Sequence, residues 1–221
     1  MPERPPSPTA PTPRELGSLG ILGGTFNPPH LGHLAIARHA LTQLRLQQVA
    51  LVPARRPPHK PIEQDPGCER RLELCRLLVE GCEGLSVCAL EAERDGPSYT
   101  VDTLESIHAS HPQAELTLIV GADIAATLAG WHEPQRLIEL ASLAVAERPG
   151  SDRGAVVKSL GALGEHARVS FLDAPAVDVS SSLVRERVRA GSAIAGLVGD
   201  AVAGYVAEHG LYQARVQAPS R

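Results

Sequence analysis

Two histidines, His30 and His33, stand where a buried apolar run gives way to a helical pattern, within the stretch GGTFNPPHLGHL. The glycines that end the apolar run, Gly23 and Gly24, allow the backbone to turn sharply and to approach a ligand closely. A helix that begins near Leu31 points unpaired amides and the positive end of its dipole toward the same space. Because such a helix start is a ready phosphate site, we predict that both imidazoles donate to a phosphate there.

This stretch differs from two well-known phosphate-binding loops. It contains neither the GxxxxGK[ST] pattern of P-loop proteins nor the GxGxxG pattern of dinucleotide-binding folds. The alternative interpretation is a tight turn followed by surface histidines. Two histidines directly after a Gly-Gly turn favour the phosphate site.

A second candidate lies late in the chain, where three serines open a helical pattern in VSSSLVRERV. The serines supply hydroxyls and helix-start amides, and Arg185 follows about one turn later with a guanidinium fork suited to phosphate oxygens. The alternative is a serine-capped surface helix.

Isolated residues elsewhere have both a functional and a structural interpretation. Lys60 lies in the proline-stiffened loop RPPHKP, and its amine could serve a site or simply belong to a solvated basic loop. His59 beside it favours neither interpretation. Asp123 closes an apolar run, so its carboxylate suits sugar hydroxyls or a helix cap. Trp131 is the single tryptophan, for which core packing is the default. In GPSYTVDTL, Ser98 or Thr100 is expected to cap a helix.

Strand-like and helix-like segments alternate along the chain. Predicted strands cover residues 18–24, 48–53, 85–90, 115–123, 142–150 and 167–174, and predicted helices cover 31–46, 68–81, 99–111, 131–141, 180–191 and 199–212. This alternation predicts one α/β domain, with a Rossmann-like, doubly wound parallel sheet flanked by helices. Ligands bind such sheets at the carboxyl ends of the strands, where the loops after the first and fourth strands fall.

Length and composition set the outer limits. The 221 residues suit a single domain, predicted over residues 17–214, with a proline-rich disordered tail at 1–16 and a short tail at 215–221. The net charge of −4 gives no reason to expect nucleic acid, and no apolar run approaches the roughly 20 residues of a membrane span. Without a signal-like start, a cytoplasmic location is expected.

The four cysteines favour buried thiols over zinc ligands. Cys68, Cys75 and Cys82 recur every seven residues, and Cys88 follows, with no CxxC pair among them. We therefore expect small buried thiols in a reducing compartment.

The motifs together resemble a known family. The HxGH pattern at His30–His33, and VSSSLVR as a variant of ISSTxxR, resemble the nucleotidyltransferase superfamily, whose fold the resemblance implies. GGTFNPPHLGH closely resembles bacterial nicotinate-nucleotide adenylyltransferases. This resemblance implies a transferase of NAD biosynthesis that uses ATP and nicotinic acid mononucleotide to give deamido-NAD and pyrophosphate. It also implies Mg²⁺ held mainly by the ATP phosphates and water, with no protein ligand for the metal.

The resemblance also implies roles for individual residues. Those expected to act catalytically are His30, His33, Lys60 and Arg185. Those expected to bind ATP are Gly23, Gly24, Thr25, Phe26, His30, His33, Asp123, Ser180, Ser181, Ser182 and Arg185. Those expected to bind the mononucleotide are Lys60, Ser98, Tyr99, Thr100, Trp131 and Arg148. Asn27, where the family more often has Asp, and Glu147, in ERPG where the family has PRPG, depart from the pattern.

Other functions stay open at this point. The acceptor could be nicotinamide mononucleotide, or the protein could be another small nucleotidyltransferase such as a pantetheine-phosphate or glycerol-phosphate enzyme. A non-catalytic nucleotide sensor would be expected to lose His33 or Arg185, and both are present. A tRNA synthetase shares a similar histidine motif, but 221 residues leave no room for an anticodon-binding domain. The sequence does not determine the oligomeric state, and a homo-oligomer is possible.

Overall fold

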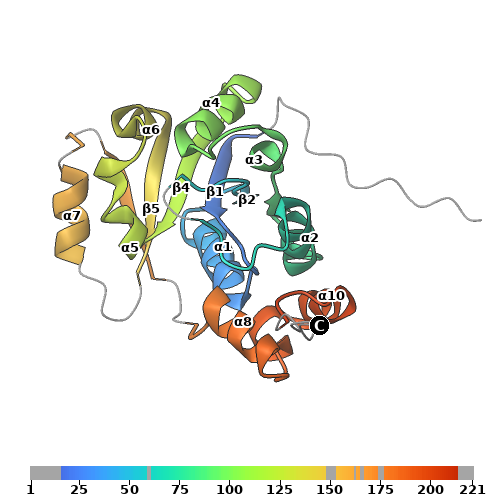
Figure 1. Cartoon of the computed structure of the whole chain (residues 1–221). Helices are drawn as coiled ribbons and strands as arrows, with labels where there is room; N and C mark the ends of the chain where they lie inside the picture. Colours follow the sequence, from blue (N-terminus) through green and yellow to red (C-terminus); the bar gives the residue numbers. More distant parts are fainter. Residues whose placement is uncertain are drawn as a thin grey trace, which may run out of the picture.

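A computed structural model describes residues 16–58, 61–147, 153–161, 163–164, 167–173 and 177–213. Within these ranges the chain forms one six-stranded sheet in the order β3-β2-β1-β4-β5-β6 (Figure 1). The strands are β1 (Ser18–Gly24), β2 (Gln48–Pro53), β3 (Leu85–Val87), β4 (Glu115–Gly121), β5 (Ala141–Ala146) and β6 (Val169–Leu172).

Every pairing in the sheet is parallel, which confirms the predicted doubly wound architecture. The chain builds outward from β1 to β3 on one side and from β4 to β6 on the other, so the strand order reverses between β1 and β4. The loops that leave these two strands therefore flank the crevice where ligands of such sheets bind.

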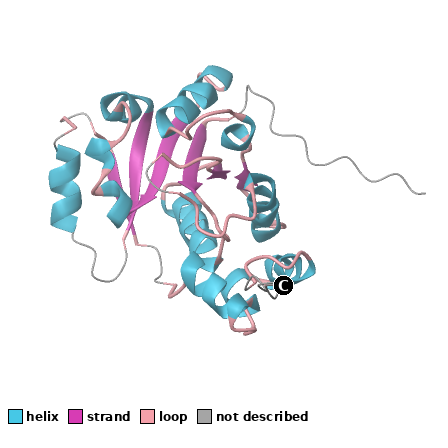
Figure 2. Cartoon of the chain, in the orientation of Figure 1, coloured by secondary structure: helices cyan, strands magenta, loops and turns pink. Residues whose placement is uncertain are grey.

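Helices cover both faces of the sheet (Figure 2). They are α1 (Leu31–Gln43), α2 (Cys68–Val79), α3 (Leu90–Glu93), α4 (Thr100–Ser110), α5 (Ala122–Ala125), the 3-10 helix η1 (Leu128–Gly130), α6 (Pro134–Leu140), α7 (Arg153–Gly161), α8 (Ser181–Arg189), α9 (Ala195–Val198) and α10 (Asp200–Glu208). One hydrophobic cluster joins the sheet to α4, α5, α6 and α7, and a second joins it to α1, α2, α8, α9 and α10. Adjacent strand residues belong to opposite clusters, as Ile21 and Leu22 do. Because both faces of β1 are buried, its sequence is an almost continuous apolar run.

Several segments differ from the sequence prediction, which did not include the short helices α5, η1 and α9. The strand predicted over residues 85–90 ends at Val87, and the helical turn α3 begins at Leu90. Residues 153–161, for which no element was predicted, form α7, whose buried residues are Val156 and Leu160. These differences concern short elements, in which the period of a pattern is hard to recognise.

The structure describes all four cysteines but little of the two predicted tails. Of the predicted tails, residues 1–15 and the whole of 215–221 lie outside the described residues, whereas Leu16 is buried. In the described part no helix has the length and apolar character needed to cross a membrane. All four cysteines are free thiols, but only Cys75 is fully buried.

A buried carboxylate joins α3 to the start of α4. Glu91 is 6% exposed and accepts a hydrogen bond of 2.8 Å from the Thr103 hydroxyl. Burial raises the pKa of the Glu91 carboxyl, while hydrogen bonds from Thr103 and Ser98 act in the opposite direction. Arg94 bonds the Tyr99 carbonyl oxygen at 3.2 Å, so the segment that leads into α4 is held from two sides.

This carboxylate predicts a pH dependence of stability. The pKa of Glu91 is higher in the folded than in the unfolded chain. The contribution of this carboxyl to the free energy of unfolding is therefore fully present below the ordinary glutamate pKa of about 4. It is lost as the pH rises through the pKa of the folded chain. Glu91→Gln, which cannot ionise, should therefore gain stability relative to the parent as the pH rises from about 4 to 7. Urea unfolding of both proteins across this range measures the difference, and a difference independent of pH would contradict the prediction.

Candidate active site

The loop between β1 and α1 turns at a residue that the sequence did not indicate. Gly23 and Gly24 belong to β1, and neither takes a positive φ; the left-handed residue is Phe26, with φ 50°. The prediction that the glycines make the sharp turn is therefore wrong. Gly24 instead makes room for the Phe26 ring, which would lie 3.2 Å from a Cβ at this position. A Cβ on Gly23 would meet no atom within 4 Å, so there is open space beside the carboxyl end of β1.

The two imidazoles lie together at the start of α1, as predicted. The ring centroids of His30 and His33 are 3.7 Å apart with an interplanar angle of 28°, and the Phe26 and His33 rings form an edge-type contact with centroids 4.9 Å apart. The His30 backbone N–H donates to Nδ1 of His33 at 3.2 Å. With Nδ1 accepting, the proton of a neutral His33 ring is on Nε2, which makes Nε2 a donor.

The glycine between the histidines has a packing role. A Cβ on Gly32 would lie 3.0 Å from Nδ1 of His30 and 3.2 Å from Cγ1 of Val179. Glycine therefore allows the first turn of α1 to approach the segment that leads into α8.

Helix α8 contacts the β1–α1 loop directly. The Ser181 hydroxyl donates to the Pro28 carbonyl oxygen at 2.8 Å, and Nη1 of Arg185 donates to the Asn27 carbonyl oxygen at 2.8 Å. Ser180 caps the helix by accepting the Leu183 N–H at 3.1 Å. The GGTFNPPHLGH and VSSSLVR segments, far apart in the sequence, are thus joined by hydrogen bonds.

Arg185 is 9% exposed and has further partners. Its Nη2 lies 3.3 Å from the Ser182 hydroxyl and 3.5 Å from Oε2 of Glu63, whose side chain is largely exposed. The Asn27 side chain donates to the Glu63 carbonyl oxygen at 2.6 Å. An aspartate could not donate this bond, which gives the family departure at Asn27 a physical reason.

The start of α4 is tied to the loop that follows β2. The Ser98 hydroxyl accepts the backbone N–H groups of Arg55 at 3.0 Å and Arg56 at 3.1 Å. The helix N-cap is Tyr99, without a side-chain cap, so the prediction that Ser98 or Thr100 caps α4 is wrong. The Tyr99 ring stacks on His132, with centroids 4.2 Å apart.

Trp131 and Asp123 lie on the β4 side of the sheet. Trp131 is half-buried, packs against the first hydrophobic cluster and donates from Nε1 to the Thr127 hydroxyl at 3.3 Å. Asp123 is exposed in the first turn of α5, where Gly121 is the N-cap, so its carboxylate is not the N-cap.

Two predicted site residues cannot be placed. Lys60, with His59 beside it, and Arg148 lie outside the described residues. Next to the first of these gaps is a cleft of about 780 Å³, lined by Arg55, Arg56, Pro57, Pro58, Ile62 and Gly96 among others. At the second, the Glu147 carboxylate lies 3.9 Å from Nη1 of Arg153. Among the residues that can be described, no group of three or more His, Cys, Asp or Glu side chains could hold a metal ion.

Sequence reasoning missed three residues around the site. Glu63 and His132 carry no local signal, because their partners are distant in sequence. Arg71 did offer one, since it falls three residues after Cys68 and four before Cys75, on the predicted apolar face of α2. The structure buries it completely.

The chain is similar in sequence to a known family and to named relatives. The cytidylyltransferase-like family model matches residues 21–187. A protein of Geobacillus kaustophilus named "Probable nicotinate-nucleotide adenylyltransferase" is 41% identical over 206 residues, which cover 93% of this chain and 91% of the relative. A protein of the same name from Gemmatimonas aurantiaca is 39% identical over 88% of this chain and 92% of its own length.

The fold also matches solved structures. The nicotinic acid mononucleotide adenylyltransferase of Plasmodium falciparum, complexed with APC, superposes with a TM-score of 0.72 at 16% identity, over 89% of this chain and 97% of that one. A second structure of that enzyme, complexed with NaAD, gives a TM-score of 0.69 over 88% and 97%. The family model and the sequence relatives together show that this chain belongs to the cytidylyltransferase-like family and, within it, to the nicotinate-nucleotide adenylyltransferases.

Proposed function

We propose that the protein transfers the adenylyl group of ATP to nicotinic acid mononucleotide, giving deamido-NAD and pyrophosphate, as a step in NAD biosynthesis. The observation that carries this proposal is the convergence of α8 on the β1–α1 loop, where Arg185 and Ser181 bond to the backbone beside two stacked imidazoles. Donors and cations gathered at the switch point of a parallel sheet suit a triphosphate. The names of the sequence relatives supply the acceptor.

The reaction needs alignment rather than a protein nucleophile. An oxygen of the mononucleotide phosphate, already ionised at neutral pH, attacks the α-phosphorus of ATP in line. A new phosphorus–oxygen bond forms, and the bond from the α-phosphorus to the bridging oxygen breaks, so the electron pair leaves with pyrophosphate. The protein then has to align two anions and stabilise the charge that develops on the leaving group.

The loop after β1 and the start of α8 would hold the triphosphate. His33 would donate through Nε2, because its Nδ1 already accepts the His30 backbone N–H. Arg185 would add positive charge from the other side, and the amides at the start of α1 would add the helix dipole. The open edge at Gly23 leaves room for phosphate or ribose to approach the backbone.

The start of α4 would bind the mononucleotide. Tyr99 and Thr100 open an 11-residue helix whose unpaired amides suit the nicotinate carboxylate. The indole of Trp131 would stack on the cationic pyridinium ring. Asp123, exposed beyond the end of β4, would accept hydrogen bonds from the adenosine ribose. Ser98, Lys60 and Arg148 complete the proposed substrate contacts.

We propose that Mg²⁺ enters with ATP, held mainly by the triphosphate and water, a mode of binding typical of this ion. The chemistry that it supplies is neutralisation of phosphate charge. The residues named above bind and orient the two substrates.

The direct test is an assay of pyrophosphate release with ATP, Mg²⁺ and one acceptor at a time. Nicotinic acid mononucleotide should be used, and nicotinamide mononucleotide serves to measure the preference between acid and amide. Phosphopantetheine and glycerol phosphate should give no turnover. Release with either of these, and none with a pyridine mononucleotide, would contradict the proposal.

His33→Ala removes a donor aimed at charge that develops during the reaction. We expect kcat to fall about a hundredfold or more, the usual cost of losing a preorganised donor, while circular dichroism shows an unchanged fold. His39→Ala, on the same helix, is the matched control and should keep the parent kcat. Near-normal turnover in His33→Ala would exclude the role.

Arg185→Ala should mainly impair the use of ATP. Loss of a charge-assisted bond to phosphate predicts a fall in kcat/KM for ATP of roughly tenfold or more, with a smaller change in KM for the mononucleotide. Arg187→Ala, an exposed position on the same helix, is the control. Unchanged ATP kinetics in Arg185→Ala would rule out the contact.

A further inference from the structure

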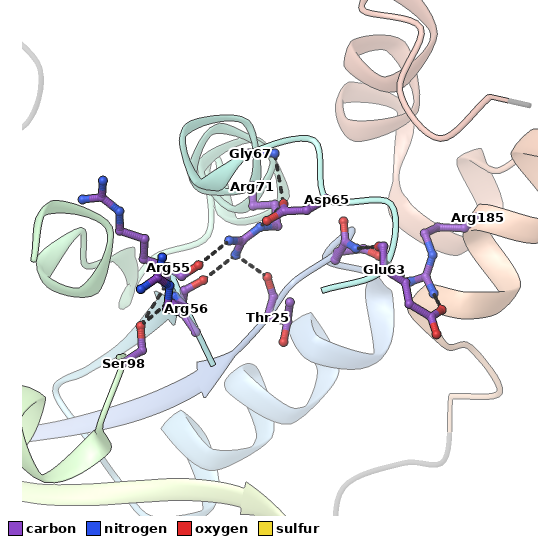
Figure 3. A network of polar contacts seen from close by, with 11 residues as sticks. Thr25, Arg55, Arg56, Glu63, Asp65, Gly67, Arg71, Ser98 and Arg185 are labelled. Atoms are coloured by element: carbon purple, nitrogen blue, oxygen red, sulfur yellow. Dashed lines mark hydrogen bonds and ion pairs between the residues drawn. The ribbon is translucent and has the colours of Figure 1, made fainter. Parts of the chain in front are cut away.

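A fully buried arginine on α2 contacts the loops that follow the neighbouring strands β1 and β2. Arg71 is 0% exposed, and arginine is almost never this buried unless its charge is paired. Its Nε donates to Oδ1 of Asp65 at 2.9 Å, and its Nη1 donates to the carbonyl oxygens of Thr25 at 2.8 Å and Ala54 at 2.7 Å (Figure 3). Nη2 lies 3.5 Å from the Arg55 carbonyl oxygen.

These carbonyl groups lie just beyond the end of the β1–β2 pairing. The register of the two strands ends with Gly24 opposite Pro53, and the Ala54 N–H still reaches the Gly24 carbonyl oxygen at 2.9 Å. The next carbonyl groups, those of Thr25 and Ala54, are where the strands diverge. The guanidinium bonds to both, so it continues the connection between the strands past the end of the sheet.

Each of these loops leads to a different half of the proposed site. Thr25 is followed by Phe26, whose ring packs against His33. Arg55, on the other side, is bonded through its backbone N–H to Ser98 at the start of α4. Arg71 therefore lies between the histidine loop and the segment that leads to Tyr99.

Asp65 fixes the orientation of the guanidinium. Its Oδ1 also accepts the Gly67 backbone N–H at 3.0 Å, immediately before α2 begins. The carboxylate is 30% exposed, whereas the arginine side chain is wholly buried. The ion pair thus ties the guanidinium to the segment that leads into α2.

We propose that Arg71 is a positioning residue for adenylyl transfer, which sets the separation between the triphosphate loop after β1 and the mononucleotide side of the site. This inference rests on the proposed function. In-line transfer depends on the alignment of the two substrates, and a misplacement of about 1 Å can cost a hundredfold in rate. The residue acts through the Thr25, Ala54 and Arg55 carbonyl groups and not by contact with substrate.

Arg71→Lys tests the proposal, because lysine keeps the charge but has a single nitrogen in place of the planar fork. We expect kcat to fall at least tenfold, with KM for ATP and for the mononucleotide within threefold of the parent. Leu78→Ala is the control for lost stability, since Leu78 is buried on the same helix in the second hydrophobic cluster. It should lower the Tm while keeping kcat within twofold of the parent.

Amide hydrogen exchange gives a readout that does not depend on activity. In Arg71→Lys, peptides covering residues 23–28 and 54–58 should exchange faster than in the parent, while those from β4 and β5 are unchanged. If Arg71→Lys does not fold, Asp65→Ala takes its place and should lower kcat at least threefold with the same exchange pattern.

Three results would overturn the proposal. These are a folded Arg71→Lys variant with kcat within twofold of the parent, an equal loss of kcat in Leu78→Ala at the same Tm, or loop exchange that does not change. If instead the parent releases no pyrophosphate with any acceptor, the proposed function fails, and hydrogen exchange still decides whether Arg71 orders the two loops.

Discussion

The loop between β1 and α1 depends on two buried guanidinium groups that reach it from opposite directions. Arg71 bonds the Thr25 carbonyl oxygen from α2, and Arg185 bonds the Asn27 carbonyl oxygen from α8. Between these anchors lies Phe26, held in a left-handed conformation that ordinary residues adopt at a cost. A backbone of this shape at the end of a strand has carbonyl groups with no neighbouring strand to bond, and the two arginines satisfy them. The geometry of the histidines follows from this, because Phe26 packs against His33.

The same arrangement accounts for the chemistry that the site can perform. Within the described residues its polar groups are mainly donors: imidazoles, serine hydroxyls, guanidinium groups and helix-start amides. Such groups stabilise phosphate oxygens and a departing pyrophosphate without taking part in covalent catalysis. Glu63 is the carboxylate that lies against Arg185, at 3.5 Å and largely exposed. An oxygen of the mononucleotide phosphate is itself the nucleophile, so hydrogen-bond donors held in fixed positions are sufficient for adenylyl transfer.

Much of the fold could be predicted from the sequence, and the reason is physical. Strands buried on both faces appear as continuous apolar runs, and the longer helices bury apolar residues along one side, so the six strands and most of the longer helices were recognisable. The pairing of His30 with His33 was predictable because the contact is local. The left-handed turn at Phe26, the Ser98 bonds to the loop after β2 and the bonding partners of Arg71 were not, because each depends on other segments of the chain. Its spacing from Cys68 and Cys75 places Arg71 on their face of α2, but only the meeting of β1, β2 and α2 shows what it bonds.

The central claim is that the β1–α1 loop and the start of α8 together form one triphosphate site. A crystal structure of the protein with a non-hydrolysable ATP analogue tests it most directly. We expect the triphosphate to lie between His33 and Arg185, with phosphate oxygens within hydrogen-bonding distance of both side chains. A triphosphate bound elsewhere, with these two residues in contact only with protein, would contradict the account.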